Sequence, residues 1–289
     1  MSRAGTLGLA GAAALLSTVS LAADLVPPPP LPPPVYQPPV VAVASGWYLR
    51  GFVGASNEFL NEVTHPIQLI APQFSHVDWG GFDAAPFGGG GIGYQWNNWL
   101  RVDATLEYRG KANFHAMDRF FNPFTGIAGT FNTDVYSASK SELVGLVNVF
   151  LDLGTWWCIT PFIGAGAGFA KIKLDHFLDI NPMAGGGGFA DSGTKTNFAW
   201  SLQGGVAYKV NPNFAVELSY RYLNVGNGET GTLLNMDPTQ APNPGVVGLP
   251  LAPFTFHRIQ SHDIMLGVRW LLQPEGPAPL PLPPLMRKG

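Results

Sequence analysis

The feature that most constrains this chain is a strict alternation of apolar and polar side chains with period two. In the segment 100–109, charged and hydroxyl side chains occupy every odd position and apolar side chains occupy every even one. Successive side chains of a β-strand point to opposite faces, whereas a helix would distribute these charges around its surface. The segment is therefore predicted to be a strand with one apolar and one polar face.

The same pattern recurs along the chain and predicts an all-β protein. It is clear again at 214–223 and 263–270, and five weaker segments share it. Most of these segments have about ten residues or a little more, which is long enough for a tilted strand to cross a lipid bilayer. The eight predicted strands are 46–56, 86–96, 100–109, 138–153, 158–172, 196–210, 214–223 and 263–270.

The lengths of the connections predict how these strands are arranged. Soluble domains seldom carry four long loops, whereas transmembrane barrels join their strands by tight periplasmic turns and longer outer loops in alternation. An even number of strands then leaves both termini in the periplasm. We expect an eight-stranded antiparallel transmembrane β-barrel over residues 46–272. The short links are 97–98, 154–157 and 211–213, and the long ones are 57–85, 110–137, 173–195 and 224–257.

Both ends of the chain are predicted to lie outside the barrel. Residues 1–22 have the pattern of a signal peptide, because Arg3 precedes an apolar stretch and small residues precede the expected cleavage site. The alternative is an N-terminal core helix. Residues 23–45 form a proline-rich periplasmic linker and residues 273–289 a second proline-rich tail, because dense prolines favour extended spacers. Contact with the cell wall is an alternative role for these tails.

Composition indicates which partners to expect. Charged residues make up 12% of the chain and hydrophobic residues 46%, which suits a protein whose surface faces lipid. Beyond the N-terminal segment, no apolar run approaches the roughly 18 residues that a spanning helix requires. The formal net charge of −3 provides no basic field for nucleic acid. The expected partners are outer-membrane lipid, lipopolysaccharide and the outer-membrane assembly machinery.

The polar faces of the predicted strands carry seven cations and six anions. The interior of an eight-stranded barrel is only wide enough for side chains, so these charges should pair across the lumen instead of lining a channel. The predicted lumen polar network contains Arg50, Arg101, Asp103, Glu107, Arg109, Glu142, Asp152, Glu217, Arg221, Asp263 and Arg269, and Lys140 and Lys209 share these faces.

Tryptophans cluster at the strand ends that are predicted to face the periplasm. Aromatic side chains are enriched at membrane interfaces, so this placement predicts an interfacial belt. Trp99 also lies there, but its parity matches the lumen set of its strand unless the turn resets the alternation. The predicted belt contains Trp47, Trp96, Trp156, Trp157 and Trp270.

Several segments carry a family resemblance. Residues 22–25 (AADL) precede the proline-rich stretch, and GWYLRG at 46–51, TPFIGAG at 160–166, ELSYRYL at 217–223 and HDIMLGVRW at 262–270 follow in that order. Together they resemble the small outer-membrane β-barrel proteins of alphaproteobacteria, a porin-like or opacity-protein-like family among the OmpA-type barrels. The resemblance spans nearly the whole chain. It implies envelope integrity or weak pore function and supplies no catalytic residues.

Three patterns that could indicate chemistry are set aside. The glycines at 88, 90 and 93 match a dinucleotide-binding pattern, but the segment leads into a turn and another strand instead of a helix. The six histidines lack metal-ligand spacing. Ser261, His262 and Asp263 are adjacent on a strand, so they cannot converge as a catalytic triad. No catalytic residue, cofactor site or metal site is predicted.

The expected function is that of a structural outer-membrane barrel that supports envelope integrity and has little or no conductance. A small porin, or a surface adhesin that binds through its long loops, is the alternative. A lipid-modifying outer-membrane enzyme is a further alternative, which would need a nucleophile and a histidine base near one strand end.

Overall fold

The computed structural model describes residues 45–64, 77–121, 131–182, 186–235 and 252–272. Every secondary-structure element within these ranges is a β-strand. No helix in the described part of the chain is long and apolar enough to cross a membrane. The predicted signal peptide, nearly all of the proline-rich linker and the C-terminal tail lie outside the described residues.

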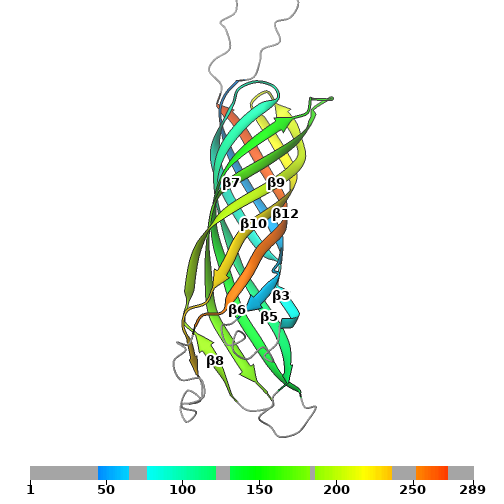
Figure 1. Cartoon of the computed structure of the whole chain (residues 1–289). Coiled ribbons are helices and arrows are strands. Elements are labelled where there is room, and N and C mark those ends of the chain that lie inside the picture. The colour runs from blue at the N-terminus through cyan, green and yellow to red at the C-terminus, as the bar shows by residue number, and fades with distance from the viewer. Residues whose placement is uncertain (1–44, 65–76, 122–130, 183–185, 236–251, 273–289) are drawn as a thin grey trace, which may run out of the picture. The chain divides into compact units, whose positions relative to one another are not determined.

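Eight long strands form a closed antiparallel ring (Figure 1). Neighbouring strands pair in chain order, and the pairing of the last strand with the first closes the ring. The all-β, eight-stranded barrel predicted from the alternation is therefore confirmed. Its strands are β1 (Gly46–Phe59), β4 (Ala85–Gln95), β5 (Leu100–Phe121), β6 (Phe131–Asp152), β7 (Ile159–Asn181), β9 (Gly193–Asn211), β10 (Phe214–Glu229) and β12 (Thr255–Leu272).

The two ends of the ring differ in their connections. Short turns at 96–99, 153–158 and 212–213 join strands at the end where β1 begins and β12 ends, and we call this the short-turn end. Four further strands extend the wall at the opposite, long-loop end. They are β2 (Glu62–Thr64), which pairs with β12, β3 (Val77–Phe82) with β5, β8 (Gly186–Ala190) with β7, and β11 (Leu233–Asn235) with β8.

Strand β5 shows how the alternation is used. Leu106 and Tyr108 are 52% and 59% exposed on the outer wall, whereas Arg101 and Arg109 are buried in the lumen. This distribution of polarity, with an apolar outer wall and a polar interior, is the reverse of that in a soluble protein. It suits a barrel that is surrounded by lipid. The faces predicted for residues 100–109 agree with this arrangement.

Past the charged segment of β5, the polarity of the two faces inverts. The β5–β6 register shifts between Arg109 and Ala112, which marks a β-bulge. Ala112 and Phe114, which follow the bulge, are buried inside, and Lys111 within the bulge is exposed outside. Apolar side chains therefore fill this part of the barrel, and polar ones face outward.

This inversion explains why two of the predicted loops were too long. The segments 110–137 and 173–195 were expected to be loops, yet β5 continues to Phe121, β6 begins at Phe131 and β7 continues to Asn181. The sequence criterion was an apolar outer face and a polar inner one, and that pattern ends where the outer wall becomes polar. Backbone pairing continues because it does not depend on which face is apolar.

Two glycines of β7 make room for large lumen side chains. A Cβ atom on Gly164 would lie 2.6 Å from Cδ1 of Phe150, and one on Gly166 would lie 2.2 Å from Oδ1 of Asn148. Both contacts are far too close, so a larger residue at either position would displace a lumen side chain.

Two substitutions on β5 test where the lipid-facing wall ends. We expect Leu106→Arg to destabilise the barrel by about 2–4 kcal/mol, because its charge enters hydrocarbon near the centre of the apolar band. His115→Arg lies beyond the bulge on the exposed face and should change the free energy of unfolding by less than about 0.5 kcal/mol. Reversible unfolding in lipid vesicles measures both. Equal costs would contradict the inversion of polarity along β5.

Candidate functional site

The lumen is the candidate site, because it collects nearly all the buried charge of the described residues. Six cations and seven anions are buried there. All eleven residues of the predicted polar network are among them. The cations are Arg50, Arg101, Arg109, Lys140, Arg221 and Arg269, and the anions are Glu58, Asp103, Glu107, Glu142, Asp152, Glu217 and Asp263.

Two charged residues lie elsewhere than predicted. Lys209, assigned to the polar faces, is exposed at the short-turn end, where its Nζ donates to Oγ1 of Thr155 at 3.1 Å. Glu58 is buried in the network, but it was missed because the first strand was predicted to end at residue 56. Extending the inward parity of Arg50 and Ser56 by two residues would have found it.

The charges form two separate layers. We call the layer nearer the short-turn end the lower layer and the one nearer the long-loop end the upper layer. The lower layer is centred on Glu217. Its carboxylate accepts from Nε of Arg269 at 3.0 Å and lies 3.2 Å from Nη1 of Arg101 and 3.3 Å from Nε of Arg50. Asp103 and Asp152 balance the remaining charge, at 3.2 Å from Arg50 and 3.1 Å from Arg101. Three cations thus meet three anions in this layer.

The upper layer is centred on Arg109. Its guanidinium donates to both oxygens of Asp263, at 3.0 and 2.9 Å, and lies 2.9 Å from Glu142. Arg221 bridges Asp263 and Glu107 at 2.7 Å each. The layer is completed by Lys140, which pairs with Glu142 and lies 2.5 Å from Glu58. Paired, hydrogen-bonded charges of this kind are the form in which ions tolerate burial.

Aromatic rings separate and bound the layers. Phe52, Phe87 and Met265 form a buried cluster between them. The Arg50 guanidinium lies 5.5 Å from the Phe52 ring, and the Arg109 guanidinium lies 4.8 Å from the Phe87 ring. Between the lower layer and the short-turn end, Phe150 and Phe162 form a second buried cluster. These cation–π contacts favour the charged state of the arginines.

Above the upper layer, an apolar plug fills the long-loop end of the barrel. The ring centroids of Phe114 and Phe256 are 4.9 Å apart, those of Phe177 and Phe254 are 4.6 Å apart, and Nζ of Lys140 lies 4.9 Å from the Phe82 ring at its lower edge. The plug has the close ring packing of a soluble protein core. Its buried aromatic members are Phe82, Phe114, Tyr136, Phe177, Phe254 and Phe256.

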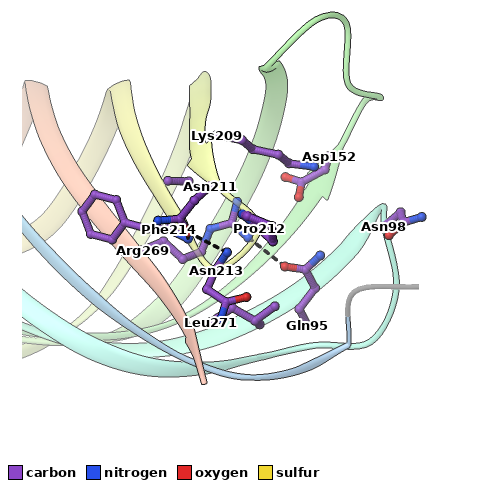
Figure 2. Close-up of a pocket in the computed structure, with 11 residues that line it drawn as sticks. Gln95, Asn98, Asp152, Lys209, Asn211, Pro212, Asn213, Phe214, Arg269 and Leu271 are labelled. Atoms are coloured by element: carbon purple, nitrogen blue, oxygen red, sulfur yellow. Dashed lines mark hydrogen bonds between the residues drawn. The ribbon is translucent and has the colours of Figure 1, made fainter. Parts of the chain in front are cut away.

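A small cavity lies at the short-turn mouth of the lumen (Figure 2). Its volume is about 40 Å³, and Gln95, Asp152 and Arg269 line it. Nη1 of Arg269 donates to Oε1 of Gln95 at 2.8 Å. A space of this size holds a few water molecules at most and leads directly onto the lower charged layer.

The predicted belt tryptophans all lie on the outer surface at the short-turn end, with exposed fractions from 51% to 95%. Trp99 is 55% exposed because it lies in the turn that resets the alternation. Their place at a membrane interface stays a prediction. A second aromatic group was not predicted, because the belt prediction rested on tryptophans at one end of the strands. On the outer wall around His262, it contains Phe59, Trp200, Tyr220 and Tyr222.

The structure does not bring Ser261, His262 and Asp263 together as a triad. Ser261 and Asp263 face the lumen, where both accept from Nη2 of Arg109 at 2.9 Å. His262 points to the outer wall and stacks on Tyr220 at 5.9 Å between ring centroids. The glycine pattern at 88–93 lies within β4. Among the described residues, no group of three or more potential ligands could hold a metal ion.

Three carboxylates lie on neighbouring strands at the long-loop rim. The Tyr136 hydroxyl donates to Asp118 at 2.9 Å, and Asp118 is paired with Asp134 across β5 and β6. Burial, together with the Asp118 charge, raises the pKa of Asp134 to about 7. Burial and the same neighbouring carboxylates raise the pKa of Asp179 to about 8. At neutral pH this rim therefore holds protons that ordinary aspartates would release.

This chain is similar to several known proteins. The family model described as outer membrane protein beta-barrel domain matches residues 12–240. An uncharacterised protein of Brucella abortus is 29% identical over 200 residues, covering 64% of this chain and 69% of that protein. A candidate adhesin of Rickettsia massiliae is 27% identical over 230 residues, covering 78% and 87%. The solved structure of OprG from Pseudomonas aeruginosa is 11% identical, covers 79% and 96%, and has a TM-score of 0.43.

The family match covers well over half of the chain, including seven of the eight ring strands and every residue of the charged layers except Asp263 and Arg269 of β12. The Brucella relative agrees with the alphaproteobacterial resemblance of the sequence motifs. The chain belongs to the outer membrane protein beta-barrel domain family of Gram-negative bacteria.

Proposed function

We propose that this protein is a nonconducting barrel that supports the outer membrane structurally. The observation that carries the proposal is the filled lumen, in which two charged layers, the aromatic clusters between and below them and the apolar plug follow one another. Each level is closed by side chains that contact one another across the barrel. The site performs no chemistry in this proposal, since its charged groups are engaged with each other.

The energies of these contacts argue against a small porin. A conducting path would have to separate several ion pairs in a water-poor interior, and an uncompensated buried charge costs several kcal/mol. It would also have to separate the packed rings of the plug, whose burial is worth roughly 1.5–3 kcal/mol for each large side chain. Both changes would have to occur together.

Adhesion is the second candidate function, because the wall of the barrel continues far beyond the length that a membrane requires. Strands β5, β6 and β7 have 22, 22 and 23 residues, and about ten suffice to cross a bilayer. The resulting rigid extension would present the long-loop end to other surfaces. The candidate adhesin among the relatives favours this role.

Conductance measurements test the nonconducting proposal. The refolded protein in planar bilayers should show no discrete current steps, because the charged layers and the apolar plug both close the lumen. Phe114→Ala combined with Phe256→Ala should remain silent, since the charged layers below the plug are unchanged. A general porin in the same bilayers is the positive control. Regular current steps from the wild-type protein would contradict the proposal.

The charged layers should also carry stability. Arg109→Met leaves buried carboxylates without their cation and should cost about 3–5 kcal/mol, whereas Lys209→Met at the exposed mouth should cost less than about 0.5 kcal/mol. The double variant Arg109→Met/Asp263→Asn should be destabilised by about 0.5–3 kcal/mol less than the sum of the destabilisations of Arg109→Met and Asp263→Asn measured alone. Reversible unfolding in vesicles measures all four variants. Strict additivity would show that the pair is not coupled.

The proposed orientation places the short-turn end in the periplasm and the long-loop end outside the cell. Cys158 is exposed in the β6–β7 turn and is the chain's only cysteine. A membrane-impermeant maleimide should label it only after the outer membrane is permeabilised. In a Cys158→Ser background, Asp191→Cys between β8 and β9 should be labelled in intact cells. The reverse result would invert the orientation.

A further inference from the structure

The outer wall carries a row of exposed lysines just beyond its apolar band. We call Lys111 of β5 and Lys171 and Lys173 of β7 the lysine row. All three are exposed on the outer wall. Strand β6 lies between the two strands that carry them, so the row occupies one side of the barrel.

The strand registers place these lysines close together. Ser141 of β6 is paired with Lys173, and on its other side it lies at the level of the bulge that contains Lys111. Neighbouring strands are about 4.8 Å apart, so the backbones of Lys111 and Lys173 are separated by roughly 10 Å. Lys171 is two residues closer to the short-turn end on the same face. The three ammonium groups can therefore reach one ligand of modest size.

Directly below the row, the wall is apolar and exposed. Tyr108, Phe169 and Phe198 are 59%, 46% and 68% exposed. Phe169 and Phe198 are paired across β7 and β9, and Tyr108 is the outward residue that precedes the bulge. Positive charge thus lies immediately above a broad apolar surface.

Most of this positive charge is not neutralised by the residues that the structure describes. Lys173 lies 2.9 Å from Asp175, which also accepts from Ser192. In the described part of the chain, neither Lys111 nor Lys171 has a carboxylate within ion-pair distance. At the corresponding boundary of β10 and β12, the outer wall instead carries Tyr220, Tyr222 and His262.

We propose that the lysine row binds the phosphate groups of lipid A, the membrane anchor of lipopolysaccharide. Lipid A carries two phosphates on a disaccharide from which acyl chains extend. Its phosphates would contact the lysines while the chains pack on Tyr108, Phe169 and Phe198. Anionic groups are attracted to lysines that lie at a lipid surface, and the apolar wall holds the chains. The inference rests on the proposed orientation, with the long-loop end outside, and is independent of whether the barrel conducts.

Binding of fluorescent bisphosphorylated lipid A to the refolded protein in neutral phospholipid vesicles tests the proposal. Replacing all three lysines with glutamine should weaken binding by roughly tenfold to a hundredfold. Replacing them with arginine should retain binding, because the charges remain. Lys209→Gln at the opposite end should leave binding unchanged. A heat-dependent shift in gel mobility for every variant confirms that each barrel has folded.

The lipid is varied in the second arm of the experiment. Fully dephosphorylated lipid A should bind the wild-type protein as weakly as the glutamine variant binds the bisphosphorylated form. Phosphatidylglycerol should compete poorly. Equal binding by wild type and glutamine variant would overturn the proposal, and so would equal competition by phosphatidylglycerol, which would indicate a site for any anionic lipid. Because no current is measured, these outcomes are separate from the conductance test.

Discussion

The pairing of buried charges across the lumen is the interaction on which the rest of this barrel depends. Thirteen ionisable side chains lie in a space that admits little water, so each must find a partner on another strand. Arg109 of β5 reaches Asp263 of β12, and Arg269 of β12 reaches Glu217 of β10. The contacts thereby tie strands together from several sides. Such pairing also opposes register slips, because a shift of one residue would place these charges against lipid.

The division into two layers follows from the same constraint. Each layer is close to neutral by itself, and Phe52, Phe87 and Met265 keep the two apart. Arginine suits this position because its planar guanidinium can donate to two carboxylates and stack on a ring at the same time. Arg221 uses both capacities: it bridges Glu107 and Asp263, and lies 5.3 Å from the Phe87 ring. A lysine here would supply a point charge without the stacking.

How much of the fold the sequence predicts depends on where a strand lies along the barrel axis. Segment 100–109 could be assigned with its faces because lipid outside and charge inside give opposite polarities at every residue. Residues 112–121 could not, because the bulge changes the parity and the apolar side chains turn inward. The charged site was predicted more fully than the strand ends. Its eleven residues are buried together; Glu58 was missed because the first strand was predicted to end two residues too early, and Lys209 is exposed at the short-turn end.

The partners within the site were beyond sequence reasoning for a geometric reason. Alternation reports which face a residue occupies, but a closed ring brings together residues far apart in the chain. Arg109 and Asp263 are 154 positions apart and meet because the pairing of β1 with β12 places β12 only three strands from β5 around the ring, so that their inward side chains reach each other in the lumen. The inverted polarity beyond the bulge follows from the same closure. Once the outer wall leaves lipid, the narrow interior is the only place where apolar side chains escape water, so the plug forms there. The lumen is thus closed by ion pairs where lipid surrounds it and by apolar packing where water does.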